Sequence, residues 1–483
     1  MCVLTIHAMT NQEKSSPHSP AIDHSVSLPW WRLLNRYHWF VFIVASLAWL
    51  FDCLDQQLFI LARNNAIGFL LGPDADPSRV KEYGGYATAI FVAGWATGGL
   101  IFGSVGDRIG RARTLALTVL LYSVCTGLSA FSRNFTDFAI YRFITGLGVG
   151  GVFGLAVALV ADALPETARP KALGMLQALS AVGNVTAGLC SMAVSGMSPS
   201  VSWKYLFWIG AAPAFLCLFI MLRLKEPEKW VKARTASRAV GGKKMGSYGD
   251  MLGVGRWRKP ALLGMLLCVA GVVGLWGVGF FSPELVGPAM DKSLRAEGLS
   301  DKALASAKNW WMSMNLIVQN IGAFAGMICF SKIAHRFGRK KAFAGGFVMA
   351  FLATMFFFLN FNGKSDLWMS AVMGFFQLGL FAGFAIYLPE LFPTRLRSTG
   401  TSFCYNVGRF IAATGPFSLG LLQKALGDKA VAALPATADA IAKADAKLSA
   451  FREAACWLSA IYLLGLVVLP FLPETKGRAM PED

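Results

Sequence analysis

The sequence predicts an all-α integral membrane protein of twelve transmembrane helices, arranged as two related six-helix bundles. Three observations support this prediction: the composition, the spacing of the apolar runs and an internal repeat. Of the 483 residues, 55% are hydrophobic and only 15% are charged, and the mean hydropathy is +0.52. Because a soluble protein carries roughly a quarter charged residues, we expect this chain to be solvated by a lipid bilayer.

The apolar runs have the length that a bilayer requires. A hydrocarbon core of about 30 Å needs about 20 apolar residues per helix, and twelve such runs lie between charged breaks. The predicted spans, in chain order, are 39–61, 85–106, 114–132, 137–161, 172–197, 204–223, 260–283, 309–331, 342–360, 367–389, 398–422 and 452–472. An even number of spans places both chain ends on the same side of the membrane.

Basic residues predict which side that is, because Lys and Arg resist translocation. Residues 224–259 carry ten of them, and the short turns 108–113 and 336–341 are also basic. The outer segment 424–452 carries lysines too, so the orientation depends on the short loops. We expect cytoplasmic termini in a plasma or bacterial inner membrane. The predicted domains are a tail at 1–38, a bundle at 39–223, a linker at 224–259, a bundle at 260–472 and a tail at 473–483.

The internal repeat appears when the sequence is shifted by 228 residues along itself. Residues 108–113 (RIGRAR) then align with 336–341 (RFGRKK), Asp162 to Pro165 align with Glu390 to Pro393, and Arg169 aligns with Arg397. Six spans separate the matched points, so the halves have parallel topology and an axis along the membrane normal relates them. We therefore expect a solute site between the halves, near the middle of the membrane.

Four segments stand out as motifs: residues 103–113 (GSVGDRIGRAR), 142–150 (RFITGLGVG), 226–230 (EPEKW) and 473–478 (PETKGR). Together they resemble the major facilitator superfamily of secondary transporters over nearly the whole chain, and the last three match its sugar-porter branch. The resemblance implies a carrier that works by alternating access. In the second copy of the first motif, Ser331 and His335 replace the expected glycine and aspartate, which weakens a gating role there.

The first of these motifs suits a gate at the inner surface. Gly99 and Gly103 leave a strip on the second span that another helix can approach closely. The resemblance implies that Asp107 faces the start of the eleventh span, where free amides favour a carboxylate. The alternative is that the turn only fixes topology through its arginines. The gating candidates are Gly103, Asp107, Arg108, Gly110, Arg111 and Arg113, with Asp162, Arg169, Glu390 and Arg397 from the second aligned motif.

Charged residues inside the spans are expected to have a function, because each costs on the order of 3 kcal/mol to insert at mid-helix. At about 1.5 Å per residue, Asp55 and Arg142 lie at a similar depth, so they can pair. The resemblance to proton-coupled sugar porters implies this pair. Asp52 resembles the paired aspartate of aromatic-acid/proton symporters, so the candidates for proton coupling are Asp52, Asp55 and Arg142. We predict that Asp55 takes up a proton when Arg142 moves away and releases it when the pair re-forms. The alternative is a static ion pair.

Arg409 lies near mid-membrane in the eleventh span, without an evident acidic partner in its half. We predict that it binds a substrate carboxylate, as a similar arginine in aromatic-acid symporters suggests; bonds to backbone carbonyls at a helix break near Gly415 are the alternative. The candidate cavity-lining residues are Gln56, Gln177, Trp276, Asn315, Gln319, Gln377, Tyr387 and Tyr405. Each could instead be a hydrogen-bonding residue in helix packing.

The predicted function is proton symport of a small organic solute, with an organic or aromatic acid favoured. Sugar or polyol symport, uniport and a non-transporting solute sensor are the alternatives, although the seventh span lacks the glutamine pair of sugar porters. The expected partners are a small solute, protons and the lipid bilayer, with the chain acting as a monomer. The basic residues that give the net charge of +18 border the membrane spans, as the positive-inside rule predicts, so no nucleic-acid partner is expected. No enzyme activity, cofactor or metal is expected, because the glycine motifs at 146–151 and 363–365 lie within or between spans and the nine cysteines are scattered.

Overall fold

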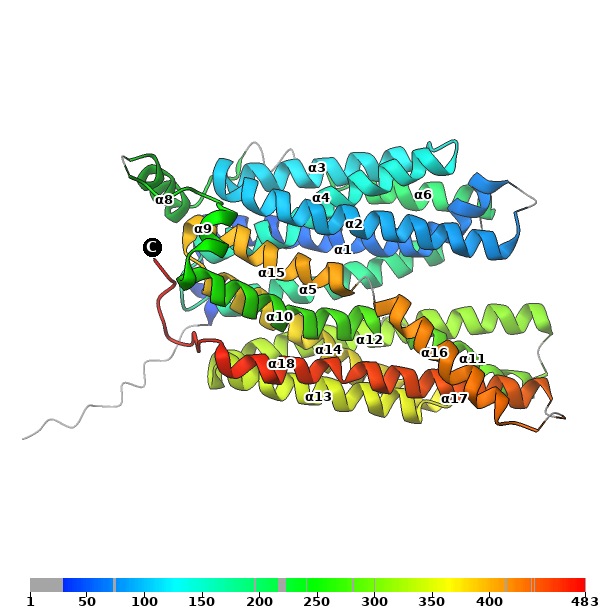
Figure 1. Cartoon of the computed structure of the whole chain (residues 1–483). Helices are drawn as coiled ribbons and strands as arrows, with labels where there is room; N and C mark the ends of the chain where they lie inside the picture. The colour runs from blue at the N-terminus through cyan, green and yellow to red at the C-terminus, as the bar shows by residue number, and fades with distance from the viewer. Residues whose placement is uncertain are drawn as a thin grey trace, which may run out of the picture.

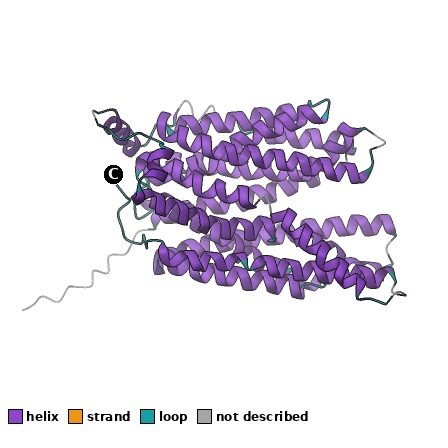
Figure 2. Ribbon diagram, in the orientation of Figure 1, coloured by secondary structure: helices purple, strands orange, loops and turns teal. Residues whose placement is uncertain are grey.

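The computed structural model describes residues 29–482 except 73–74, 195–196, 216–222, 240, 280–281, 299, 413–414, 436 and 438. Helices dominate this part of the chain, and none of the described residues forms a strand (Figure 2). The helices lie in two bundles side by side, with helix axes roughly parallel (Figure 1). The structure thus confirms the all-α fold; most of the predicted tail at 1–38 lies outside the described residues.

Among the described residues, six α-helices belong to the N-terminal bundle. They are α1 (Arg36–Leu71), α2 (Pro77–Ile109), α3 (Arg111–Ser129), α4 (Phe135–Ala163), α5 (Arg169–Ala193) and α6 (Pro199–Ala211). Two short helices follow in the connection between the bundles, α8 (Glu228–Arg238) and α9 (Tyr248–Gly253). The C-terminal bundle consists of α10 (Gly255–Gly277), α11 (Ser282–Ala296), α12 (Asp301–Phe337), α13 (Arg339–Asn360), α14 (Trp368–Tyr387), α15 (Arg397–Ala412), α16 (Gly415–Ala432), α17 (Ala440–Ser459) and α18 (Ile461–Val468).

Ten helical segments among the described residues are long and apolar enough to cross a membrane. They correspond to ten of the twelve predicted spans. The predicted spans 204–223 and 398–422 each contain residues outside the described part. Several helices run further than their apolar runs, because polar turns beyond a bilayer core can still form backbone hydrogen bonds. For example, α1 extends to Leu71, ten residues past the predicted end at 61.

Close glycine contacts show that the two bundles share one packing pattern. A Cβ atom on Gly98 of α2 would collide with the backbone carbonyl of Leu147 in α4. Gly326 of α12, which lies 228 residues further along, stands in the same relation to Phe375 of α14. Since Leu147 and Phe375 are also 228 residues apart, the repeat found in the sequence corresponds to equivalent helix crossings.

In the described part of the chain, the bundles meet mainly where α5 packs against α12 and α14 and where α15 packs against α2 and α4. Residues near the two chain ends, together with α8 and α9, lie at one end of the molecule, which we call the terminal side (Figure 1). The turn between α16 and α17 lies at the opposite end, which we call the distal side. The interface between the bundles therefore runs from one membrane face to the other.

Candidate functional site

Asp107 joins the two bundles at the terminal side. It lies near the end of α2 and is fully buried. Its carboxylate accepts hydrogen bonds from the backbone amides of Ser398 and Thr399, at 3.2 and 2.8 Å, and from the Thr399 hydroxyl at 2.7 Å. These residues begin α15, so Asp107 supplies acceptors for helix amides that have no partner within their own helix. The approach depends on Gly103, where a Cβ atom would press against Ser402 of α15.

Asp107 also belongs to a cluster of four buried charged residues. Arg111, at the start of α3, pairs with Asp107 at 3.3 Å and with Asp162 at the end of α4. Arg397, at the start of α15, also pairs with Asp162. In addition, Arg111 donates to the carbonyl oxygen of Thr394 at 2.7 Å. Arginines from opposite bundles thus share one carboxylate, and we call Asp107, Arg111, Asp162 and Arg397 the terminal cluster.

Three other gating candidates occupy the turn next to this cluster. Gly110 has a φ of +126°, which favours glycine at the junction of α2 and α3. The Arg108 guanidinium donates to the carbonyl of Gly246 in the connecting segment at 3.3 Å. The backbone amide of Arg113 donates to Glu226 at 3.2 Å, as does that of Arg111 at 2.8 Å. Glu226, from the EPEKW segment, therefore binds the start of α3.

The repeated motif forms its main charged contacts inside the C-terminal bundle. Arg339 pairs with Glu390 at 2.6 Å, and the amides of Arg339 and Lys340 donate to Glu474, each at 3.0 Å. Arg169, the counterpart of Arg397, donates weakly to the Leu164 carbonyl at 3.4 Å. The two copies therefore use the same local chemistry, but the direct charged contact that links the bundles comes from Arg397.

Asp55 and Arg142 are both fully buried in the N-terminal bundle. The guanidinium of Arg142 donates to the hydroxyls of Ser129 (2.7 and 3.1 Å), Thr126 (3.3 Å) and Thr145 (3.1 Å). No hydrogen bond joins Arg142 to Asp55, and the Nη1 atom of Arg142 has no partner; Thr126, which accepts from Arg142, also interacts with the Asp55 carboxylate. Arg142 is nevertheless the positive charge that acts on Asp55. The two residues thus share one polar region without a direct hydrogen-bonded pair.

Arg409 lies at the interface between the bundles, almost completely buried. Its guanidinium centre is 3.6 Å from the ring centroid of Trp95 on α2 and 4.3 Å from that of Tyr405 on its own helix. The Nε and Nη1 atoms have no hydrogen-bond partner. Asp52 of α1 acts on Arg409 electrostatically, while the Gln56 amide donates to the Asp52 carboxylate at 2.9 Å. The charged groups at this point therefore come from both bundles.

Aromatic rings from four helices extend the surroundings of Arg409. Tyr405 stacks on Phe153 of α4 at a centroid distance of 3.9 Å, and Trp276 of α10 makes an edge contact with Trp95 at 5.9 Å. Trp95 and Phe153 were not predicted. With 37 phenylalanines and 14 tryptophans in the chain, an aromatic residue within an apolar run gives no signal that distinguishes a site residue from a packing residue.

The other predicted cavity residues are buried at various places. Asn315 donates to Ser282 at 3.1 Å, Gln377 to Thr354 at 2.7 Å, and Tyr387 to the carbonyl of Pro473 at 2.6 Å. These three polar groups therefore bond within the C-terminal bundle or its tail. Gln177 of α5 and Gln319 of α12 are also buried, on the two helices that form one edge of the interface.

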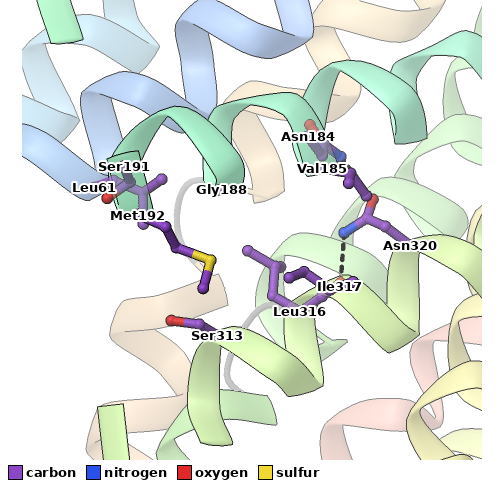
Figure 3. A pocket seen from close by; sticks show the side chains of 10 residues that line it. All are labelled: Leu61, Asn184, Val185, Gly188, Ser191, Met192, Ser313, Leu316, Ile317 and Asn320. Atoms are coloured by element: carbon purple, nitrogen blue, oxygen red, sulfur yellow. Dashed lines mark hydrogen bonds between the residues drawn. The ribbon is translucent and has the colours of Figure 1, made fainter. Parts of the chain in front are cut away.

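A pocket lies between the bundles in their distal half, and Figure 3 shows its lining from close by. It is lined by Leu61, Asn184, Val185, Gly188, Ser191, Met192, Ser313, Leu316, Ile317 and Asn320, which belong to α1, α5 and α12. Met192 extends toward the α12 side of the pocket in the close view. At one end, Asn184 donates to Asn320 across the interface at 2.9 Å.

The family assignment follows from a match that spans well over half of the chain. A sequence model described as Major Facilitator Superfamily matches residues 58–416. The chain belongs to the major facilitator superfamily. It is therefore a multi-pass membrane transporter of small solutes and not an enzyme, as the sequence predicted.

Similar facilitators cover most of the chain. A Haemophilus influenzae protein, whose name assigns it provisionally to metabolite transport, is 28% identical over 451 residues, covering 92% of this chain and 99% of the relative. The niacin transporter NiaP of Acinetobacter baylyi is 25% identical over 413 residues (79% and 87%). The cis,cis-muconate transport protein of the same organism is 26% identical over 383 residues (79% and 86%).

A solved facilitator has the same fold. The structure of the proton:xylose symporter XylE bound to 6-bromo-6-deoxy-D-glucose matches with a TM-score of 0.70 and covers 92% of this chain and 98% of the other. The sequence identity is 18%, so this likeness shows the fold alone. It confirms the predicted facilitator architecture of two six-helix bundles.

Proposed function

We propose that this facilitator carries an organic acid, most simply an aromatic one, together with protons by alternating access. The observation that carries the proposal is the buried guanidinium of Arg409, whose Nε and Nη1 atoms have no hydrogen-bond partner. A buried charge with unused donors is costly, and a substrate carboxylate would satisfy both the charge and the donors. Because both bundles contribute to the site, a single chain suffices as the transport unit.

The rings around Arg409 support a planar substrate. Trp95 and Tyr405 cover the guanidinium, and Phe153 and Trp276 pack against those two rings. Offset stacking and edge contacts would select an aromatic or conjugated acid over a hydrated sugar. The names of two relatives support the same substrate class, since one is a niacin transporter and the other a cis,cis-muconate transport protein.

The contacts between the bundles support an access cycle in which the terminal side is closed. The terminal cluster ties α2, α3 and α4 to α15, whereas the pocket between α5 and α12 lies on the distal side. We assign the terminal side to the cytoplasmic face of a cell membrane, because the basic connection 224–259 lies there. In this assignment, the closed terminal side is the inner side, with Asp107 and its partners as the inner gate.

Asp55 and Arg142 are our candidates for proton coupling. A carboxylate that is buried close to a guanidinium but not bonded to it responds strongly to small movements of that charge. A shift of α4 against α1 that moved Arg142 relative to Asp55 would therefore change the proton affinity of the carboxylate. A static structural role for the two residues is the alternative.

Proteoliposomes with a pH electrode outside test the proposal. We expect benzoate, nicotinate or cis,cis-muconate, but not xylose, to cause alkalinisation of the medium with the wild-type protein. Arg409→Gln should weaken carboxylate affinity roughly 10- to 100-fold, because it removes charge-assisted hydrogen bonds. Asp55→Asn should retain counterflow of labelled acid but lose the pH change. A response to xylose alone, or unchanged carboxylate affinity in Arg409→Gln, would contradict the proposed substrate class. Undiminished acid-driven accumulation in Asp55→Asn would exclude its role.

A further inference from the structure

A cleft with a basic lining lies at the terminal side, between α8 and the start of α3, and we call it the basic cleft. Its volume is about 450 Å³, within the range of roughly 300–1,000 Å³ of pockets that hold small molecules. Four of its lining residues are basic and one is acidic. The lining residues are Arg113, Lys225, Glu226, Trp230, Val231, Arg234, Thr235 and Arg238.

The positive charge of the basic cleft is not neutralised by the protein. In the described part of the chain, the side-chain nitrogens of its four basic residues form no ion pair and no hydrogen bond. Glu226, the acidic residue, is already bound, because its carboxylate oxygens accept from the first three amides of α3. Arg234 lies over the Trp230 ring, with its guanidinium centre 5.0 Å from the ring centroid. The cleft therefore presents charged donors that suit an anion with several oxygens.

The position of the cleft at the membrane surface indicates where that anion comes from. Arg113 is the third residue of α3, a helix that is long and apolar enough to cross a membrane. The start of α1 lies beside the cleft, because the Tyr37 hydroxyl donates to the backbone carbonyl of Lys225 at 2.8 Å. Just before α1, Trp30 contacts Trp31, which is 51% exposed. Since Trp and Tyr gather at the headgroup level of bilayers, the cleft lies at the depth of the lipid phosphates.

We propose that the basic cleft binds the headgroup of an anionic phospholipid, such as phosphatidylglycerol, from the leaflet at the terminal side. The phosphate accepts hydrogen bonds from the arginines of α3 and α8, and it supplies the missing negative charge. Val231, which is 47% exposed, gives the wall of the cleft an apolar surface for the carbon atoms of the lipid. The inference goes beyond the proposed function, because lipid binding requires no substrate.

Lipid binding in the cleft also favours the closed terminal side. The Nε1 atom of Trp230 donates to the backbone carbonyl of Asp107 at 2.8 Å, so α8 is attached directly to the terminal cluster. The same helix contacts α4 in one bundle and the 3₁₀ helix η5 (Thr394–Leu396), just before α15, in the other. A lipid that binds both α3 and α8 therefore stabilises the arrangement in which α8 lies against both bundles.

Native mass spectrometry of the full-length protein in detergent tests the binding site. The probes are phosphatidylglycerol and phosphatidylcholine with the same acyl chains, and glycerol 3-phosphate as a soluble phosphate. We expect the wild-type protein to bind its first phosphatidylglycerol more tightly than its first phosphatidylcholine. Arg234→Gln combined with Arg238→Gln should weaken phosphatidylglycerol binding by roughly fivefold for each charge removed and leave phosphatidylcholine binding unchanged.

Two further variants distinguish a site from general surface charge. Lys232→Gln combined with Lys243→Gln is the matched control, because it removes two exposed positive charges from the same connection, outside the cleft. This control should keep the wild-type preference for phosphatidylglycerol. Arg113→Gln changes the opposite wall of the cleft without altering α8, and it should also weaken phosphatidylglycerol binding.

Three results would overturn the proposed site. They are a wild-type protein without a preference for phosphatidylglycerol, an equal loss of that preference in both double variants, and an Arg113→Gln variant that binds like the wild type. Binding of glycerol 3-phosphate at the same concentrations as phosphatidylglycerol would show that the ligand is a soluble phosphate and not a lipid.

Hydrogen–deuterium exchange in nanodiscs tests the effect on the terminal side. Exchange at the start of α15 should be slower in discs that contain phosphatidylglycerol than in discs of phosphatidylcholine alone. The lysine control should keep this difference, and Arg234→Gln with Arg238→Gln should lose it. Equal exchange of the wild-type protein in both kinds of disc would refute the stabilisation of the closed terminal side.

Discussion

Arg142 shows how a guanidinium can be buried in a helix bundle among hydroxyl groups. Ser129 accepts two of its hydrogen bonds, and the Phe207 ring lies 4.8 Å from its centre. Ser129→Ala should therefore lower the free energy of unfolding by about 1–3 kcal/mol, because it leaves buried donors without an acceptor. Thermal unfolding in detergent measures the loss. Thr118→Val is a suitable control, since the Thr118 hydroxyl donates to Leu115 in its own helix; an equal loss in the control would contradict the prediction.

Some residues of the candidate site could be predicted from the sequence, and others could not. Asp52, Arg142 and Arg409 were recognisable because a charge stands out in an apolar run. That Arg111 and Arg397 share the Asp162 carboxylate was not, because these residues lie in different halves and meet only when the bundles pack. Trp95 was missed for a different reason: it resembles every other aromatic residue in a membrane span. The sequence pattern thus identified the charged residues, but their partners became evident only from the tertiary contacts.

At the level of helices, the same capping interaction occurs once in each bundle. Glu226 accepts from the first amides of α3, and Glu474 accepts from the first amides of α13. The motifs were visible in the sequence as EPEKW and PETKGR, and the resemblance gave them a family. Their physical role could not be predicted, because each glutamate caps a helix more than a hundred residues away in the chain.

Glu474 also makes the stability of the C-terminal segment depend on pH. Partial burial raises the pKa of its carboxyl group, but hydrogen bonds from the amides of Arg339, Lys476, Lys340 and Thr475 outweigh this effect, so the pKa lies below its ordinary value. A depressed pKa in the folded state stabilises the protein above the unfolded pKa of about 4.3. This contribution is lost as the pH falls through the lower folded pKa.

Glu474→Gln should therefore melt at a lower temperature than the wild type at neutral pH. In acid, the two proteins should melt at the same temperature. At neutral pH, the substitution should lower the free energy of unfolding by about 0.3–1 kcal/mol, which is typical of a carboxylate at a helix N-terminus. Melting of both proteins across the pH range measures it. Glu453→Gln is a control on exposed surface, because the Glu453 carboxylate only accepts a long bond, 3.4 Å, from Trp457. A constant gap between wild type and Glu474→Gln down to acidic pH would show that the charge of Glu474 is not the cause.

For the whole molecule, the approach of the bundles at the terminal side depends on missing side chains. A Cβ atom on Gly154 of α4 would collide with the Ser402 hydroxyl of α15, whereas Gly188 of α5 has open space around its position in the distal pocket. These two glycines therefore provide a matched pair of sites at opposite ends of the interface. A larger residue at Gly154 should oppose closure of the terminal side, and one at Gly188 should oppose closure of the distal side.

Gly154→Val is expected to destabilise the closed terminal side by about 1–3 kcal/mol through overpacking, which shifts a two-state equilibrium roughly 5- to 150-fold. Hydrogen–deuterium exchange should then become faster at the start of α15 and at the end of α2, and slower around Asn184 and Asn320. Gly188→Leu should leave exchange at the terminal side as slow as in the wild type while reducing transport. Both changes alter only packing volume, so opposite exchange patterns would show that the two ends of the interface open in alternation. Faster exchange throughout Gly154→Val would instead indicate general destabilisation.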